Sequence, residues 1–164
     1  MLGFYFSPIG RITRKAYWLK YVIPLVVVTL ASGLADQFFF PEMLLSSDTG
    51  PVSAILNLVL LWPTIAVTTK RFHDRNMSGW WQLLFNAGIG VGAFMVGMAI
   101  GAAGGDPEAL SQQELPMLLG GMAVILAAGG IELVLLGFLP GTKGRNDHGD
   151  DPLNPAKDVA DVFS

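Results

Sequence analysis

The sequence of 164 residues contains no cysteine and few charged residues. Without cysteine there is no disulfide framework, no thiol nucleophile and no cysteine metal site. Charged residues make up 14% of the chain, whereas they make up roughly 25% of an average soluble domain. Hydrophobic residues make up 52%, and the mean hydropathy is +0.51. Because so few charges cannot keep a soluble surface hydrated, the composition indicates a membrane protein.

Catalytic motifs are also absent from the sequence. It has no G-x-S-x-G motif, no P-loop and no HExxH motif, and it has only two histidines. We therefore predict no enzyme activity, no cofactor and no metal site. We interpret His73 and Asp74 as a satisfied His–Asp pair rather than as metal ligands. A nucleic-acid partner is disfavoured, because the net charge is −3 and the basic residues would lie against the membrane.

Four segments are long and apolar enough to cross a bilayer, which needs about 20 helical residues. They run over about residues 16–35, 52–69, 80–101 and 117–139. Lipid cannot satisfy backbone hydrogen bonds, so these segments should be helices. The first has no signal-peptide cleavage pattern, and we expect it to be retained. The prediction is an all-α integral membrane protein, with one membrane domain over residues 1–164 forming a four-helix bundle with a cytoplasmic polar cap.

Lysine and arginine are missing from two of the three predicted loops. All ten lie within residues 11–20, within residues 70–75 or in the tail, residues 140–164. The loops 36–51 and 102–116 carry acidic residues instead: Asp36, Glu42, Asp48, Asp106, Glu108 and Glu114. This asymmetry predicts a multi-pass protein with both termini, the tail and the central loop in the cytoplasm.

Glu132 is the one acidic residue deep inside a predicted span. A charge at the centre of a membrane helix costs about 2.5–3.5 kcal/mol, so its carboxyl group should be paired, neutral or facing water. Thr64 and Asn86 fall at similar depths on the second and third spans, and Lys20 lies somewhat shallower on the first but has a long side chain that could bridge the gap. We predict an intramembrane polar layer of these four residues that fixes the register of the helices. An ion or proton relay is the alternative.

The third and fourth spans carry glycines at spacings that allow close helix packing. Gly88 with Gly92, and Gly97 with Gly101, are small-xxx-small pairs in the third span. The fourth span contains two further pairs, Gly120-Gly121 and Gly129-Gly130. We interpret these faces as contacts within the chain, with a homo-oligomer as the alternative.

Three polar segments should share the cytoplasmic face. Residues 10–18 read GRxxRxxYW, residues 71–81 read RxHDxxxSGWW, and residues 140–152 read PGxxGxNxxGxDP. In this order, among four hydrophobic spans, the motifs resemble the domain of unknown function 805 family, small bacterial inner-membrane proteins. The resemblance covers essentially the whole chain and implies an inner-membrane protein with no established activity and no catalytic residues to carry over. Two positions depart from the family pattern: Lys70 stands where arginine is common, and His148 stands where an aromatic residue is usual.

The candidate site residues are the polar groups of these segments that can hold an anion or each other. They are Arg11, Arg14, Arg71, His73, Asp74, Arg75, Ser78, Asn146 and Asp151. Arginine forks suit phosphate or carboxylate, and Ser78 is placed to cap the third span. We predict a structural or interaction role in which membrane lipids, through anionic headgroups, are the partners. The alternatives are a transporter or channel subunit, or a binder of a small anionic ligand.

Overall fold

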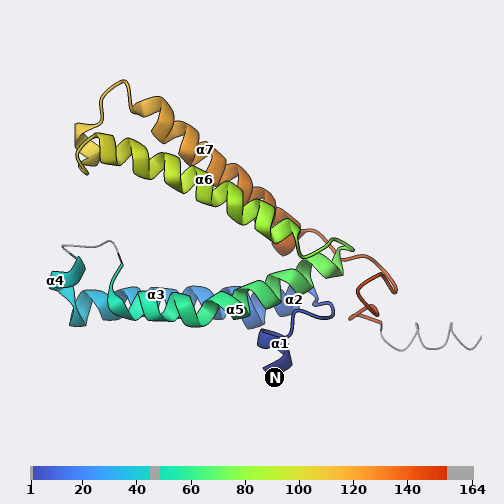
Figure 1. Ribbon diagram of the computed structural model, residues 1–164. Helices are drawn as coiled ribbons and strands as arrows, with labels where there is room; N and C mark the ends of the chain where they lie inside the picture. The colour runs from blue at the N-terminus through green and yellow to red at the C-terminus, as the bar shows by residue number, and fades with distance from the viewer. Residues whose placement is uncertain (1, 45–48, 155–164) are drawn as a thin grey trace, which may run out of the picture. The chain divides into compact units, whose positions relative to one another are not determined.

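The structure is a computed structural model that describes residues 2–44 and 49–154 (Figure 1). Within these ranges there is no β-strand, only an isolated bridge between Asn146 and Gly149. Four helical stretches are long and apolar enough to cross a membrane: Arg14–Phe39, Pro51–Asp74, Trp81–Ala102 and Leu115–Phe138. The predicted all-α fold with four spans is confirmed. Asp48, Lys157 and the end of the tail lie outside the described residues.

The chain divides into two compact units, which we describe separately. The first contains residues 1–78 and 140–164, and the second contains residues 79–139. The prediction of a single membrane domain over residues 1–164 stays a prediction. The helices of the first unit are α1 (Leu2–Phe6), α2 (Arg14–Tyr17), the π-helix η1 (Trp18–Val22), α3 (Ile23–Phe39), α4 (Pro41–Leu44) and α5 (Pro51–Asp74). Helices α3 and α5 lie side by side (Figure 1).

Pro24 lies at the start of α3, immediately after η1. Proline has no N–H group, so it cannot donate to the carbonyl oxygen of Lys20, four residues earlier. The hydroxyl group of Tyr5, on α1, donates a hydrogen bond to that oxygen at 2.7 Å. A side chain from the N-terminal helix therefore satisfies a backbone group that the proline leaves open.

The short helix α1 is fastened to α5 by two side chains. Lys70 is buried, and its ammonium group donates to the carbonyl oxygens of Gly3, at 3.1 Å, and Phe4. The indole N–H of Trp62 donates to the carbonyl oxygen of Phe6 at 2.9 Å. These carbonyls lie at the C-terminal end of a short helix, where few N–H donors remain, although that of Gly3 also accepts from the N–H of Ser7 at 3.3 Å. Lys70 thus acts here as a compact donor to a helix terminus.

Asp36 corrects one prediction of the sequence analysis, which assigned it to a loop. It lies in α3, is 1% exposed, and accepts hydrogen bonds from the backbone N–H groups of Val52 and Ser53, both at 2.8 Å. The first N–H groups of a helix have no partner within the helix, so a carboxylate there is favourable. A Cβ atom on Gly50 would overlap this carboxyl group, so glycine is required.

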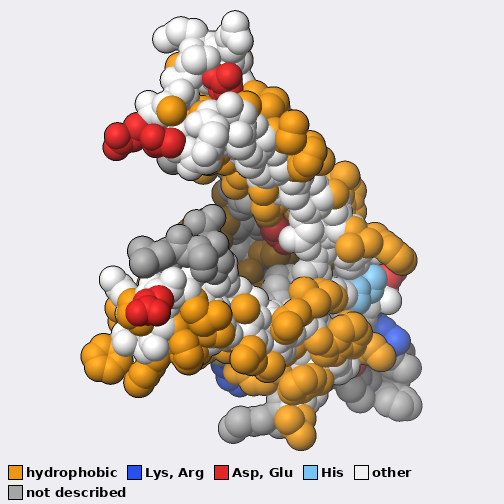
Figure 2. Space-filling model, turned by 60° about the vertical axis from the view of Figure 1, so that its left-hand side comes forward, with side chains coloured by type: hydrophobic (Ala, Val, Ile, Leu, Met, Phe, Trp, Pro, Cys, Tyr) orange, Lys and Arg blue, Asp and Glu red, His pale blue; other side chains and the backbone are white. Residues whose placement is uncertain are grey.

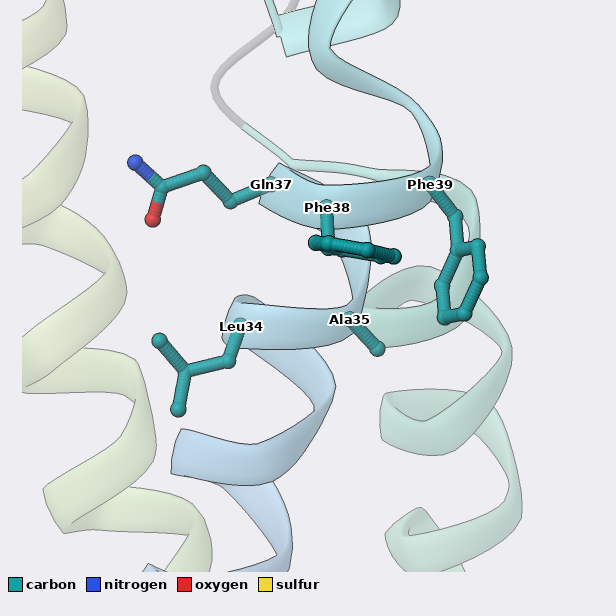
Figure 3. Close-up of a pocket in the computed structure, with 5 residues that line it drawn as sticks. All are labelled: Leu34, Ala35, Gln37, Phe38 and Phe39. Carbon is teal, nitrogen blue, oxygen red and sulfur yellow. The ribbon is translucent and has the colours of Figure 1, made fainter.

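The C-terminal end of α3 carries exposed aromatic side chains. Phe38 and Phe39 are 80% and 67% exposed, and their ring centroids are 5.0 Å apart. With Leu34, Ala35 and Gln37 they line an open hollow of about 480 Å³ (Figure 3). Leu34 and Gln37 extend to one side of the helix and Phe39 to the other (Figure 3). Such exposed apolar side chains suit the boundary between lipid and water.

Helix α5 extends beyond the predicted end of the span at residue 69 and finishes at Asp74. Of the cations that suggested a loop, Lys70 and Arg71 lie within the helix and Arg75 is its C-cap residue, and the positive charge of Arg71 in the last turn interacts favourably with the helix dipole. The helix ends in a Schellman motif: Asn76 has φ 57°, its N–H donates to the carbonyl oxygen of His73, and that of Met77 donates to Phe72. The polar loop is therefore shorter than the sequence suggested.

The second unit is a pair of long helices. Its elements are α6 (Trp81–Ala102), the 3₁₀-helix η2 (Pro107–Ala109), α7 (Leu115–Leu133) and the π-helix η3 (Val134–Phe138). Helices α6 and α7 run side by side (Figure 1). A Cβ atom on Gly92 or on Gly121 would come 2.7 Å from the other residue's carbonyl oxygen. The first predicted glycine pair thus packs within the chain.

Large apolar side chains are exposed along all four long helices, and Figure 2 shows them over much of the helix surface that it displays. Examples are Val27 at 59%, Leu58 at 74%, Phe94 at 69% and Leu126 at 71% exposure. A soluble monomer rarely carries apolar surface of this extent. These flanks are suited to contact with lipid tails.

The contact between Asp36 and α5 predicts that Asp36→Ala destabilises the first unit. The variant leaves two helix N–H groups without their acceptor, and we expect its unfolding temperature in detergent to fall by about 2–4 °C. Gln37→Ala, at the exposed neighbouring position, serves as the control. Equal unfolding temperatures for the two variants would contradict the capping role.

Candidate functional site: a polar cap of three segments

The structure brings together the three polar segments that the sequence analysis singled out. The parts of these segments and their immediate neighbours that meet are residues 10–14, residues 70–76 at the end of α5, and residues 140–153 of the tail. We call this set the polar cap. All three segments belong to the first unit, so their mutual contacts are described directly.

Arg11 joins all three segments of the polar cap. Its side chain is 1% exposed, and its Nε donates to the carboxylate of Asp74 at 3.2 Å. Its Nη1 donates to the carbonyl oxygens of Gly144, at 2.7 Å, and Gly149, at 3.2 Å. Its Nη2 donates to the carbonyl oxygen of Thr142 at 2.5 Å and to the hydroxyl oxygen of the same residue at 3.3 Å. The planar fork thus contacts α5 and the tail at once.

Asp74 holds two arginines in a site closed to water. One carboxylate oxygen accepts from Arg11 and the other from Arg71, whose side chain is fully buried. Gly141 packs directly against this carboxylate, because a Cβ atom there would overlap it. The cluster carries two positive charges and one negative charge, and the carbonyl groups of the tail offset the excess.

Thr142 and Asn146 fasten the tail to the end of α5. The N–H and the hydroxyl of Thr142 both donate to the carbonyl oxygen of Asp74, at 2.8 and 3.1 Å. The side-chain amide of Asn146 donates to the carbonyl oxygen of His73 at 2.8 Å and to the hydroxyl of Thr142 at 2.9 Å. Because these carbonyls lie at the helix end, the tail serves as the C-terminal cap of α5.

The two histidines of the chain lie face to face. The imidazole rings of His73 and His148 have centroids 3.9 Å apart and planes 2° apart. His148 therefore packs as an aromatic ring at the position where the resembling family usually has an aromatic residue. Because the nitrogen lone pairs of an imidazole lie in the plane of the ring, those of two parallel stacked rings do not converge on one point, which is a poor geometry for two ligands of one metal ion.

The carboxylate of Asp151 organises the backbone of the tail. Its carboxylate accepts from the backbone N–H groups of Leu153, at 2.9 Å, and Gly144, at 3.0 Å. These hydrogen bonds, and the positive charge of Arg11, hold the pKa of Asp151 below its usual value, against the opposing effect of burial. Gly144 has φ 72°, a left-handed conformation in which glycine carries no steric penalty.

The remaining candidate residues of the cap have different surroundings. Arg14 is exposed and lines a small hollow of about 140 Å³, together with Lys143, Asp74 and Asp151 among others. Arg75 is half-buried, and its Nη1 donates to the carbonyl oxygen of Pro140 at 3.3 Å. Both charge signs line the hollow, so it does not select an anion strongly.

The capping prediction for Ser78 is wrong in its register. Helix α6 begins at Trp81, and Trp80 rather than Ser78 occupies the N-cap position. Gly79 and Trp80 form a turn, and their carbonyl oxygens accept from the N–H groups of Gln82 and Leu83. These hydrogen bonds join residues three apart rather than four, which tightens the first turn. The α-helix therefore starts later in the sequence than predicted.

The predicted intramembrane polar layer stays a prediction, because its members divide between the two units. Lys20 and Thr64 belong to the first unit, and Asn86 and Glu132 to the second. The ammonium group of Lys20 lies 5.8 Å from the centre of the Phe4 ring, and the carbonyl oxygen of Thr64 accepts from Thr68. Glu132 is half-buried and Asn86 is exposed.

Sequence reasoning missed two residues of the cap and its surroundings. Thr142 contacts Arg11, Asp74 and Asn146, and Lys70 anchors α1. The signal for Thr142 was its place directly after Pro140-Gly141, where the chain must turn back. Nothing near Lys70 in the sequence indicates its partners, which lie 66 and 67 residues away.

Comparison with known proteins supports the resemblance. The family described as "Protein of unknown function (DUF805)" matches residues 5–150. The chain is 32% identical to the Uncharacterized protein YiiR of Escherichia coli (strain K12) over 150 residues, which is 89% of this chain and 86% of YiiR. It is 32% identical to Inner membrane protein YhaH of the same organism over 76 residues, 46% of this chain and 60% of YhaH. Inner membrane protein YhaI is 29% identical over 76 residues, 46% of this chain and 58% of YhaI. No solved structure matches the chain.

The contacts of Arg11 predict that Arg11→Gln releases the tail. Removing one partner from a buried ionic cluster costs about 3–5 kcal/mol, so amide hydrogen exchange over residues 141–151 should accelerate strongly at neutral pH. The control is Arg145→Gln, whose pair with Asp150 is largely exposed and should contribute less than about 1 kcal/mol. Unchanged exchange in Arg11→Gln would show that the guanidinium does not hold the tail.

The lowered pKa of Asp151 predicts a tail that loosens in acid. Its carboxylate stabilises the folded tail fully above about pH 4, the ordinary value for aspartate, and this stabilisation is lost as the pH falls through the lower folded value. Protection of the Gly144 and Leu153 amides from exchange, corrected for intrinsic rates, should follow this course. In Asp151→Asn the protection should be lower at pH 7 and lack this acid step, whereas Asp150→Asn should behave like the wild type.

Proposed function

We propose a role for this chain, which belongs to the DUF805 family of proteins of unknown function, from the chemistry of its own polar cap. The role is a non-enzymatic structural or interaction role in the bacterial inner membrane. In it the cap closes the cytoplasmic ends of α2 and α5 and contacts anionic lipid headgroups. The inner-membrane setting is supported by the four apolar helices and by the names of the relatives YhaH and YhaI.

One observation carries the structural part of the proposal: the guanidinium of Arg11 is buried and donates only to groups of the chain itself. Arg71 and Asp74 are buried with it. An arginine whose donors all point to carbonyl and carboxylate oxygens of its own chain has none left in this arrangement for a substrate. The centre of the cap therefore serves to hold the tail in place.

The lipid part of the proposal is supported by the cations at the edge of the cap. Arg14, Lys143 and Arg145 are exposed, and Arg145 shares a solvent-exposed pair with Asp150. Basic residues near an anionic membrane surface contribute about 1 kcal/mol each. The positive-inside rule, applied to the ten-to-zero division of Lys and Arg, supports placing both termini and the cap in the cytoplasm.

A homo-oligomer is a further part of the proposal and is supported by the second glycine pair of α6. No described atom outside the local helix lies within 4 Å of a Cβ placed on Gly97 or Gly101. Glycines that leave a helix surface open allow close approach of another helix. The first pair, by contrast, is occupied by α7.

We expect the exposed cations to set the lipid preference of the purified protein. Replacing Arg14, Lys143 and Arg145 together by glutamine should reduce the enrichment of phosphatidylglycerol over phosphatidylcholine by about tenfold or more, since each cation contributes about 1 kcal/mol. The lipid that co-purifies from a defined mixture is quantified by mass spectrometry. Asp106→Asn with Glu108→Gln, in the opposite loop, is the control. An unchanged preference in the triple variant would refute headgroup contact by the cap.

A further inference from the structure

A small apolar groove with one cation lies between α1, the η1–α3 helix and α5, and no residue of the polar cap lines it. Its volume is about 90 Å³. Its lining residues come from all three elements: Tyr5, Lys20, Tyr21, Pro24, Leu25, Val28, Leu60 and Pro63. Lys20 is the only charged residue among them, and no acidic side chain lines the groove.

The walls of the groove are fixed by groups already described. Pro24 on α3 and Pro63 on α5 each contribute a rigid ring to the lining of the groove. The hydroxyl of Tyr5 donates to the carbonyl oxygen of Lys20, which holds α1 against the break before Pro24. Tyr21 is 7% exposed, and its ring centroid lies 5.5 Å from that of Tyr17. Contacts within the chain therefore fix the positions of several side chains that line the groove.

Lys20 gives the lining of the groove a positive charge without a matching carboxylate. Lys20 is exposed, and its ammonium group lies 5.8 Å from the centre of the Phe4 ring. The ammonium group of Lys70 lies 5.0 Å from the same ring. Neither lysine forms a salt bridge within the part of the chain that the structure describes. The ammonium group of Lys70 is buried and donates to the carbonyl oxygens of Gly3 and Phe4, so the exposed ammonium group of Lys20 is the one that can attract an anion to the groove.

We infer that the groove binds one anionic phospholipid, with part of an acyl chain between Pro24 and Pro63 and the phosphate at Lys20. An enclosed cavity of about 150 Å³ accommodates a benzene ring, so 90 Å³ holds a few methylene groups and not a whole soluble ligand. The rest of a chain can continue along the exposed apolar flank of α3, where Val28 is 42% exposed. A lysine with its stem on apolar surface and its ammonium group outward suits a lipid phosphate.

The test uses the full-length protein purified with an equal mixture of phosphatidylglycerol and phosphatidylcholine, and native mass spectrometry of the lipid that remains bound. The wild type should retain one phosphatidylglycerol molecule. Lys20→Gln should reduce its occupancy about fivefold, the effect of one basic residue near anionic lipid. Val28→Trp should fill the groove and remove the bound lipid.

Matched controls lie beside each variant. Lys15→Gln removes an exposed cation that neither lines the groove nor belongs to the cap, and Val27→Trp adds the same bulk at an exposed neighbouring position that does not line the groove. Both should retain the lipid. Lys20→Arg should restore retention, and Glu132→Gln should leave it unchanged if Lys20 serves the lipid rather than the predicted polar layer.

Two results with these variants would overturn the inference. One is equal retention by Lys20→Gln, Val28→Trp and their controls, and the other is equal retention of phosphatidylcholine and phosphatidylglycerol by the wild type. If a groove variant fails to fold, a phosphatidylglycerol with a photoreactive acyl chain is cross-linked to the wild type instead. Labelling within residues 21–28 or 60–63 supports the site, and labelling confined to other segments refutes it. The triple variant of the polar cap keeps the groove intact, so the two proposals can fail separately.

Discussion

The buried carboxylate of Asp74 is the group on which the polar cap depends. It is shared by the guanidinium groups of Arg11 and Arg71, and all three side chains are nearly closed to water. A buried charge left without its partner is strongly destabilising, so the loss of one member of the cluster should weaken the attachment of all three segments. The tail enters this cluster through carbonyl oxygens at Thr142 and Gly144. Its attachment therefore depends on hydrogen bonds and charge more than on apolar packing.

The same requirement for satisfied polar groups recurs along the first unit. The carbonyl that Pro24 leaves open is satisfied by Tyr5, the carbonyls of α1 by Lys70, and the first N–H groups of α5 by Asp36. In a chain with so few polar side chains, those near helix breaks and ends make long-range contacts. The flanks of the helices remain apolar, which is the condition for exposure to lipid.

The four helices and the three polar segments of the cap could be predicted, because hydrophobic runs and clusters of cations are local properties of the sequence. The end of α5 could not be predicted. The polar residues there suggested a loop, but in the structure they continue the helix, where positive charge interacts favourably with the helix dipole. Asp36 was missed because its partners are 16 and 17 residues away, and Arg11 meets Thr142 at a separation of 131. Which partner a polar group finds depends on the path of the chain in space.

The stacked imidazoles give the tail a spectroscopic signature of its own. The sequence has two histidines, one at the end of α5 and one in the tail, with ring planes 2° from parallel. Protons held above an aromatic ring experience its ring current and resonate upfield. The carbon-bound protons of both imidazoles should therefore shift together when the tail is seated, and return together when it leaves. A pair of native resonances thus reports the state of the tail without any introduced label.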